Sequence, residues 1–204
     1  MARQEERREV TRGAILAAAQ SLFGSRSYAH VAVDQIAAEA GVAKGAIYHH
    51  FSTKADLFEV VLREVAAQIL TKVQAALFQQ SDAFSAMSAA NRAFFVSCAD
   101  PHFAQIFLRD GPSVLGWERW REVDASYFGG MVRTALHAAM EAGVIIRRPI
   151  DPLVRLMLGA VTEAAIDCAN SENFAETAEG YLEALDVVLD GLKPDRIDAR
   201  PASA

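Results

Sequence analysis

Apolar residues recur at every third or fourth position along most of the chain, which is the period of amphipathic α-helices. Near the start, Ile15, Leu16, Ala19 and Phe23 follow this period and predict a helix over residues 5–24. The same period predicts further helices over residues 54–79, 82–99, 117–142, 152–169 and 175–192. The alternation typical of strands does not occur, so the sequence predicts an all-α fold of about nine helices.

The segment VDQIAAEAGVAKGAIYHHF, residues 33–51, has the pattern of two short helices joined by a tight turn. Ile36 and Ala37 supply the inward face of the first helix, and Ile47 supplies that of the second. Gly41 lies at the turn, where a positive φ suits glycine alone. The spacing is that of a helix-turn-helix, whose second helix enters the DNA major groove. An ordinary helical hairpin with a polar outer face is the alternative.

The outer face of the second short helix carries groups that can bond phosphates and base edges. Lys44 is a cation, and Tyr48 and His49 offer hydrogen-bonding side chains. Gly45 and Ala46 have small side chains, so the helix backbone can approach DNA closely. The Ala46 methyl can also contact a thymine methyl. We therefore expect DNA contacts from Ala43, Lys44, Gly45, Ala46, Tyr48, His49 and Lys54.

The residues from Thr11 to Leu57 resemble the DNA-binding domain of the TetR family of transcriptional regulators. The resemblance rests on ILAAAQSLFGSRSY and on VAVDQIAAEAGVAKGAIYHHFSTKADLF. It implies a three-helix DNA-binding domain at residues 9–69, joined by a long helix to an effector-binding and dimerising helical bundle at residues 70–204. Ala32 and Ala43 depart from the family, which has Thr or Ser before each short helix. We expect Asp34 to replace part of the first lost cap.

The charge of the chain is unevenly distributed. The net charge is −6, yet residues 1–60 hold seven Lys or Arg and seven Asp or Glu, so the remainder carries the whole excess. A DNA-binding protein needs only a local positive face, which Arg3, Arg7, Arg8 and Arg12 can supply. No apolar run is long enough to cross a membrane, and no signal peptide is evident, so we expect a cytoplasmic protein without membrane contact.

The reactive side chains do not form a catalytic or metal-binding motif. Cys98 and Cys168 each lie in an apolar helical context and are expected to be core thiols, with a redox switch as the alternative. No Ser/His/Asp arrangement, HExxH, P-loop or Cys/His cluster occurs. We therefore expect neither enzymatic activity nor a cofactor or metal.

Aromatic residues concentrate between positions 94 and 128. They are interpreted either as the core of a helical bundle or as the lining of a ligand pocket. The family resemblance implies the second interpretation, with a hydrophobic or aromatic small molecule as effector. The candidate lining residues are Phe94, Phe103, Phe107, Trp117, Trp120, Tyr127 and Thr162.

The last two long helices carry broad apolar stripes with small residues among them. Such stripes form either a core or an interface, and the resemblance implies a four-helix interface between two copies of the chain. A dimer would place two recognition helices on a palindromic operator. The expected interface residues are Leu153, Met157, Val161, Ala164, Tyr181, Leu185 and Val188, and residues 192–204 are expected to form a frayed tail.

The sequence thus predicts a ligand-responsive transcriptional repressor. A homodimer would bind double-stranded operator DNA and be released by a small-molecule effector. The alternative is a helical adaptor that binds other proteins without specific DNA binding. DNA binding that weakens as salt rises would distinguish the two.

Overall fold

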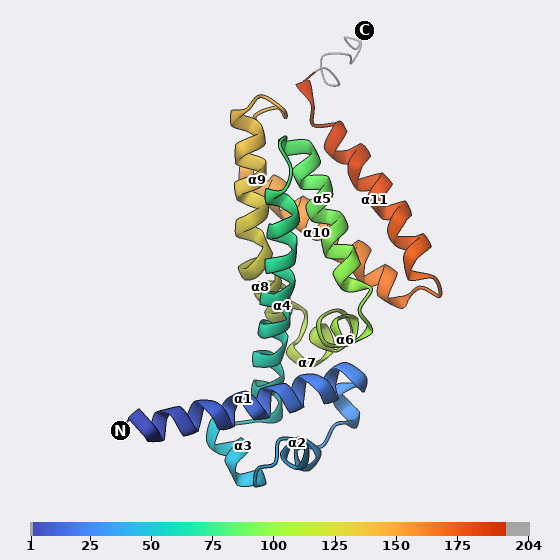
Figure 1. Ribbon diagram of the computed structural model, residues 1–204. Helices are drawn as coiled ribbons and strands as arrows, with labels where there is room; N and C mark the ends of the chain where they lie inside the picture. Colours follow the sequence, from blue (N-terminus) through green and yellow to red (C-terminus); the bar gives the residue numbers. More distant parts are fainter. Residues whose placement is uncertain (1, 195–204) are drawn as a thin grey trace. The chain divides into compact units, whose positions relative to one another are not determined.

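The computed structural model describes residues 2–194, with side chains from residue 4, and all its regular elements are helical (Figure 1). The all-α prediction is therefore confirmed. Residues 195–204, most of the expected tail, lie outside the described range. Within that range, no helix is both long and apolar enough to cross a bilayer. The helices are α1 (Ala2–Ser25), α2 (Val33–Glu39), α3 (Lys44–His50), α4 (Lys54–Phe78), α5 (Ala83–Cys98), α6 (Pro101–Phe103), α7 (Gly111–Leu115), α8 (Trp117–Asp124), α9 (Gly130–Glu141), α10 (Ile150–Asn170) and α11 (Phe174–Asp190).

Two π-helical segments interrupt the middle of the chain, at Ala104–Asp110 and Ala125–Gly129. The period of apolar residues predicts one helix over 117–142, but the second π-helical segment divides it into α8 and α9. Glycine followed by proline usually marks a turn, so the pair Gly111-Pro112 predicts the end of a helix. The chain nevertheless stays helical through α7. Pro112 fits there because the first turn of a helix needs no N–H from it. The helix ends instead at Gly116, whose φ is +79°.

The helix ends follow from local side-chain chemistry. Before α4, the Asp56 N–H donates to the Thr53 hydroxyl oxygen at 3.0 Å, and the Thr53 N–H donates to the Asp56 carboxylate at 3.0 Å. Ser52-Thr53 interrupts the apolar pattern just before Asp56, which predicts a helix cap here, and this reciprocal pair confirms it. Before α5, the Asp82 side chain accepts from the Ser85 N–H. Asp151 directly precedes Pro152, which predicts that Asp151 caps the helix that follows. Instead Pro149, which has no capping side chain, precedes α10, and Asp151 lies within its first turn.

The chain forms two compact units, the first comprising Met1–Ala67 and Asp100–Arg121. Within it, α1 contacts α2, α3, α6 and the first π-helical segment. Phe23, Tyr28 and Phe58 stack edge-on or tilted, with ring centroids 5.2–5.6 Å apart. The sequence assigns residues 100–121 to the C-terminal bundle. The structure packs them against α1, and the Tyr28 N–H donates to the Asp110 carboxylate at 2.7 Å.

Trp120 occupies the centre of the packing around residues 100–121. It is completely buried, and its indole N–H donates to the Phe107 carbonyl oxygen at 2.8 Å. A Cβ added to Gly111 would lie 2.8 Å from the Trp120 ring, so glycine allows the two segments to approach closely. Phe103 stacks on Phe107 at 5.3 Å between centroids. These aromatic residues therefore build the core of the first unit.

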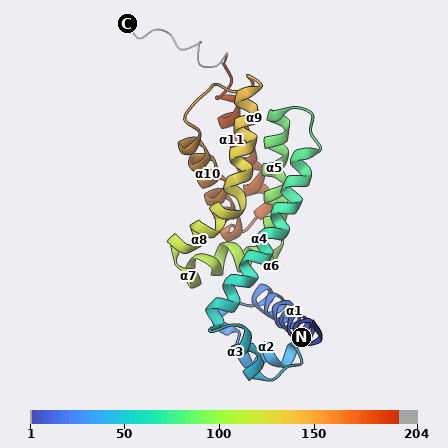
Figure 2. The same cartoon turned by 90° about the vertical axis from the view of Figure 1, so that its left-hand side faces the viewer.

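The second unit comprises Gln68–Ala99 and Glu122–Ala204. In this unit α10 contacts α5, α9 and α11, and α5 also contacts α9 and α11 (Figures 1 and 2). Phe94 and Phe128 meet edge-on with centroids 5.4 Å apart. Helix α4 contributes its residues up to Ala67 to the first unit and the following residues to the second.

Both cysteines are free and buried in the second unit. Burial raises the pKa of Cys98 well above its usual range, and burial together with Asp167 raises that of Cys168 to about 11. Both thiols are thus protonated at neutral pH and shielded from reagents.

We expect neither thiol to react with an aromatic disulfide reagent at pH 8 in the native protein, because the reactive species is an accessible thiolate. Both should react after unfolding in guanidinium, which is the matched control. Rapid labelling of the native protein, measured by absorbance and mass spectrometry, would contradict this expectation and favour a redox role.

Candidate functional site

Helices α2 and α3 form the predicted helix-turn-helix. Ile36 and Ile47 are almost fully buried, and the turn between the helices contains Gly41 with a φ of +66°. Ala32 and Ala43 occupy the N-cap positions of α2 and α3, and neither can provide a side-chain cap. At α2 the Gln35 side chain accepts a hydrogen bond from the Ala32 N–H at 2.8 Å and so satisfies one backbone donor at this helix end. The buried isoleucines thus fix which face of α3 points outward.

The outward face of α3 contains most of the residues expected to contact DNA. Lys44, Gly45, Tyr48 and His49 are exposed, with Tyr48 retaining 49% of its surface, and Ala46 is half-buried. The structure therefore brings these groups together on one surface, along with the exposed N-cap residue Ala43.

Positive charge from α1 lies near the end of α3. Phe51 directly follows α3, and the Arg12 guanidinium lies 5.8 Å from the centroid of its ring. Burial lowers the pKa of His50, and the charges of Arg8, His49 and Arg12 lower it further, so this imidazole is neutral near pH 7. Arg8 and Arg12 thus place positive charge near this end of α3, and Glu9 places negative charge there as well.

Lys54 has a different environment from the residues on α3. Its ammonium group donates to the Tyr28 carbonyl oxygen at 2.6 Å and lies 3.9 Å from the centroid of the Tyr28 ring. The side chain is half-buried, and burial lowers its pKa. In this arrangement Lys54 holds the loop after α1 against the start of α4.

Lys44 forms an ion pair with Asp34 of α2 at 3.0 Å. The expectation that Asp34 replaces part of the cap of α2 is wrong, because Asp34 lies in the first turn and its carboxylate pairs with Lys44. The two side chains are 52% and 68% exposed, so water screens the pair and its contribution to stability is small. The carboxylate nevertheless places negative charge beside a cation that is a candidate phosphate contact.

Replacing Asp34 by asparagine is expected to tighten binding to operator and random DNA alike by a factor of a few at low salt, because a charge that repels phosphates is removed. Fluorescence anisotropy across a salt series measures this. Glu39→Gln, on the same helix but outside the ion pair, is the control and should change binding less. Weaker binding by D34N would show instead that Asp34 positions Lys44.

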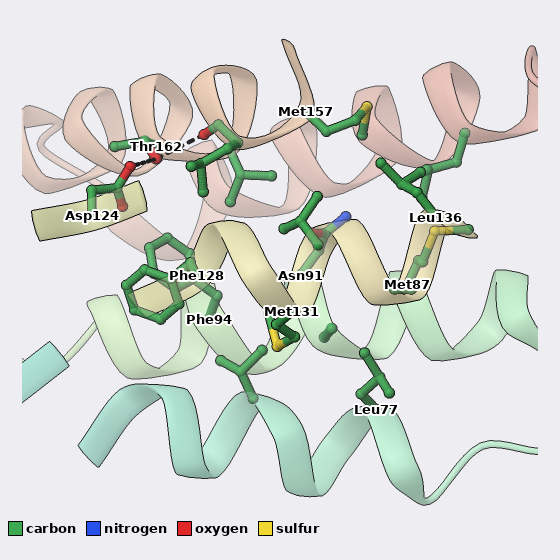
Figure 3. Close-up of a pocket in the computed structure, with 17 residues that line it drawn as sticks. Leu77, Met87, Asn91, Phe94, Asp124, Phe128, Met131, Leu136, Met157 and Thr162 are labelled. Carbon is green, nitrogen blue, oxygen red and sulfur yellow. Dashed lines mark hydrogen bonds between the residues drawn. The ribbon is translucent and has the colours of Figure 1, made fainter. Parts of the chain in front are cut away.

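The second unit contains an apolar cavity bounded by α4, α5, α9 and α10 (Figure 3). Its volume is about 70 Å³. Phe94 and Phe128 lie beside Asp124 and Thr162 at one end, whereas Met87 and Leu136 lie toward the other. The cavity is thus mostly apolar with its carboxylate at one end.

The structure divides the seven residues that the sequence suggests as a pocket lining. Phe94 and Thr162 line the cavity, but Tyr127 does not. The remaining four candidates belong to the first unit. Trp117 is 56% exposed there, whereas the other three are buried, namely Phe103, Phe107 and Trp120. Their aromatic character reflects packing around α6 and α7.

The most polar lining residue, Asp124, is absent from the sequence-based candidates. A detectable signal exists: Asp124 lies four residues after Trp120 and four before Phe128, so a carboxylate interrupts an apolar helical stripe. The cavity-lining methionines give no comparable signal, because methionine at helical spacing is ordinary core.

The residues expected at a dimer interface also fall into distinct environments. Ala164, Met157 and Leu185 are buried within the chain, and Met157 and Val161 line the cavity. The Tyr181 hydroxyl donates to the Asp167 carboxylate at 2.8 Å. Leu153 and Tyr181 are half-buried, and Val188 is exposed. The most exposed large apolar residues of α10 and α11 are Leu156 at 70% and Val187 at 71%.

Two family models match the chain. Residues 15–61 match the model described as "Bacterial regulatory proteins, tetR family". Residues 84–192, more than half of the chain, match that described as "Tetracyclin repressor-like, C-terminal domain". The first match contains α2 and α3, and the second contains most of the cavity lining.

Individual proteins agree with these matches. The Transposon Tn10 TetC protein of Escherichia coli is 24% identical over 177 residues, covering 85% of this chain and 87% of that protein. A solved TetR-family transcriptional regulator from Pectobacterium atrosepticum has a TM-score of 0.83 and 26% identity, covering 97% and 98%. The structure of RolR with resorcinol has a TM-score of 0.74 at 17% identity, covering 98% of each chain, and shows likeness of fold alone.

Proposed function

We propose that the chain is a ligand-responsive repressor. The premise is that it belongs to the tetR family of bacterial regulatory proteins and is a transcriptional regulator with a helix-turn-helix domain. In this proposal a cytoplasmic homodimer binds a palindromic operator, and a small effector releases it. The observation that carries the proposal is the exposed face of α3, where Lys44, Tyr48 and His49 lie on a helix anchored by Ile47.

The DNA contacts divide by chemistry. Lys44 and the arginines of α1 would bind phosphates, which contribute affinity without sequence information. Tyr48 and His49 would provide hydrogen bonds at the groove, and Ala46 would contact a thymine methyl. Few of these groups make bidentate base contacts, so the shape of the DNA would contribute to selectivity. Repression follows because a dimer on a promoter blocks polymerase.

Dimerisation is supported by the exposed apolar residues on α10 and α11. Leu156, Val187 and Val188 are more than half exposed, although side chains of this kind are usually buried. We propose that these residues, with Leu153 and Tyr181, contact their counterparts in a second copy across a twofold axis.

The interface is tested by Val187→Lys, which should convert dimer to monomer because it places a charge in an apolar contact. The matched control is Val96→Lys on α5, since Val96 is 69% exposed compared with 71% for Val187. Light scattering after gel filtration gives the mass. A V187K protein that stays dimeric would exclude this part of α11 from the interface.

The ligand component rests on the cavity of the second unit. An apolar cavity with a few polar groups is the usual form of a small-molecule site. RolR, which shares the fold, was solved in complex with its ligand resorcinol. Val73 and Leu77 of α4 line the cavity, and α4 also extends into the first unit. A ligand that binds better to one arrangement of α4 would shift the population toward that arrangement and so change DNA affinity.

The proposed function is tested by a salt titration of DNA binding, using the DNA that flanks the protein's own gene and random DNA of equal length. A selective complex of two chains per site that weakens as salt rises would support it, since released counterions make phosphate binding salt-dependent. Indifference to sequence at every salt concentration would instead favour the helical adaptor.

A further inference from the structure

We propose that Asp110 and Lys54 position the helix-turn-helix for operator binding without touching DNA, by fixing the loop that leads into α2. Asp110 ends the first π-helical segment and Lys54 begins α4, and both bind Tyr28 of this loop. The inference rests on the proposed function, because it concerns binding to an operator. It goes further by assigning a role in that binding to two residues outside the exposed face of α3.

The entry loop, residues 26–32, connects α1 to α2 and so decides where the helix-turn-helix begins. Its centre is one short 3-10 helix, Tyr28–His30, in which the His30 N–H donates to the Ser27 carbonyl oxygen at 2.9 Å. None of the three residues of this turn is buried. Because so short a turn has little stability of its own, contacts from other parts of the first unit must fix its position.

Side chains from distant parts of the sequence bind both sides of the Tyr28 backbone. The Tyr28 N–H donates to Asp110 Oδ2 at 2.7 Å, and the Tyr28 carbonyl oxygen accepts from the Lys54 ammonium at 2.6 Å. Together the two contacts fix the peptide groups before and after the Tyr28 Cα. We call these three residues the Tyr28 clamp.

The Tyr28 side chain is held as well as its backbone. Its ring packs against the rings of Phe23 and Phe58, at 5.6 and 5.2 Å between centroids, and both phenylalanines are completely buried. The Lys54 ammonium lies 3.9 Å from the centroid of the Tyr28 ring, within the range of a cation–π interaction. The clamp therefore ties the entry loop to the core of the first unit.

The segment that carries Asp110 also packs closely against the end of α1. A Cβ added to Gly24 would lie 2.8 Å from the His102 Cβ, so glycine allows this close approach. Helix α1 contacts both α6 and the π-helical segment that ends at Asp110. Asp110 is thus part of a framework that is itself fixed to α1, directly before the entry loop.

The environments of Asp110 and Lys54 do not suit direct contact with DNA. Asp110 is 7% exposed, and Lys54 is half-buried with its ammonium bound to the Tyr28 carbonyl and ring. Their effect on DNA binding must therefore pass through the entry loop and α2, which contacts α3. Binding surfaces depend on supporting residues of this kind, because a recognition group must be held in its productive position. Both are positioning residues.

Position and charge affect DNA binding in different ways. Binding to random DNA depends mainly on phosphates, and the number of phosphate contacts sets the slope of affinity against salt concentration. Reading bases also requires the recognition helix to lie correctly in the groove. Loss of the clamp should therefore lower operator affinity more than random-DNA affinity and leave the salt slope unchanged. Loss of a phosphate contact lowers both affinities and makes the slope shallower.

Asp110→Ala tests the clamp, with Asp110→Asn as the matched control. Asparagine retains an oxygen that can accept from the Tyr28 N–H, whereas alanine leaves this N–H without its acceptor. D110A should weaken operator binding at least about tenfold and random-DNA binding less than about threefold, with an unchanged salt slope. D110N should bind both DNAs nearly as the wild type does. Fluorescence anisotropy of the full chain across a salt series measures all four affinities.

Lys54→Met is a second variant, which also decides the matter if D110A does not fold. Methionine retains an unbranched apolar side chain and deletes the ammonium that binds the Tyr28 carbonyl. Operator affinity should fall by a factor of a few with an unchanged salt slope. A slope shallower by roughly 0.9 would show that Lys54 binds a phosphate and would refute its assignment to the clamp.

Hydrogen exchange without DNA measures the clamp by itself. The amides of residues 26–32 should exchange faster in D110A than in D110N, because the entry loop opens more easily without its anchor. Equal exchange in the two variants, or wild-type operator affinity in D110A, would overturn the inference and leave the proposed function intact. Absent operator selectivity in the wild-type chain would instead refute the proposed function, and the inference with it.

Discussion

Trp120→Ala is expected to lower the free energy of unfolding by about 3–5 kcal/mol, the range for removing a large buried aromatic side chain. Trp120 is completely buried, and its indole N–H donates to the Phe107 carbonyl oxygen at 2.8 Å. The substitution creates a cavity beside Phe107 and Gly111 and leaves a buried carbonyl oxygen without this donor. Urea unfolding followed by far-UV circular dichroism measures the effect.

The matched control is Trp117→Ala, one turn earlier on the same helix. Trp117 is 56% exposed although its ring centroid lies only 5.1 Å from that of Trp120. We expect its replacement to cost about 1 kcal/mol or less, as is usual for a surface substitution that leaves little cavity. Equal costs for the two tryptophans would contradict the assignment of Trp120 to the core of the first unit.

Tyr48→Ala is expected to weaken operator binding by at least about tenfold, equivalent to 1.4 kcal/mol or more, while leaving dimerisation and stability unchanged. Tyr48 is 49% exposed on α3, so its removal costs little packing. It is the largest side chain on the outward face of that helix. Anisotropy with labelled operator measures the affinity, and light scattering reports the dimer.

Tyr48→Phe separates the phenolic hydroxyl from the ring. Full affinity in Y48F would assign the contact to the ring, whereas a loss equal to that in Y48A would assign it to the hydroxyl. Normal operator binding by Y48A would remove Tyr48 from the contact surface and leave Lys44 and His49 as the candidates.

The helix-turn-helix could be predicted because its constraints are local. Gly41 adopts a positive φ, Ile36 and Ile47 are buried, and Thr53 with Asp56 forms the cap before α4. Each depends on residues within one or two turns of chain. The pattern could not show that Lys44 pairs with Asp34 or that Lys54 binds the Tyr28 carbonyl, because those contacts depend on how separate helices meet.

The membership of the two units could not be predicted in the same way. Helical spacing shows that Phe107 and Trp120 are buried, but it does not show which helix covers them. They pack in the first unit, whereas Phe94 and Thr162 line the cavity of the second. The stripes of α10 and α11 have the same ambiguity, since Leu185 faces the core of its own chain and Val187 faces outward.

The central claim is that the chain reads DNA sequence as a symmetric dimer. Selection of bound fragments from a random-sequence DNA pool by the full chain tests it most directly. We expect enrichment of an inverted repeat whose half-sites are separated by about one helical turn or a multiple of it, and loss of this enrichment with Y48A. Recovery of fragments without a shared motif, at salt concentrations where binding persists, would contradict it.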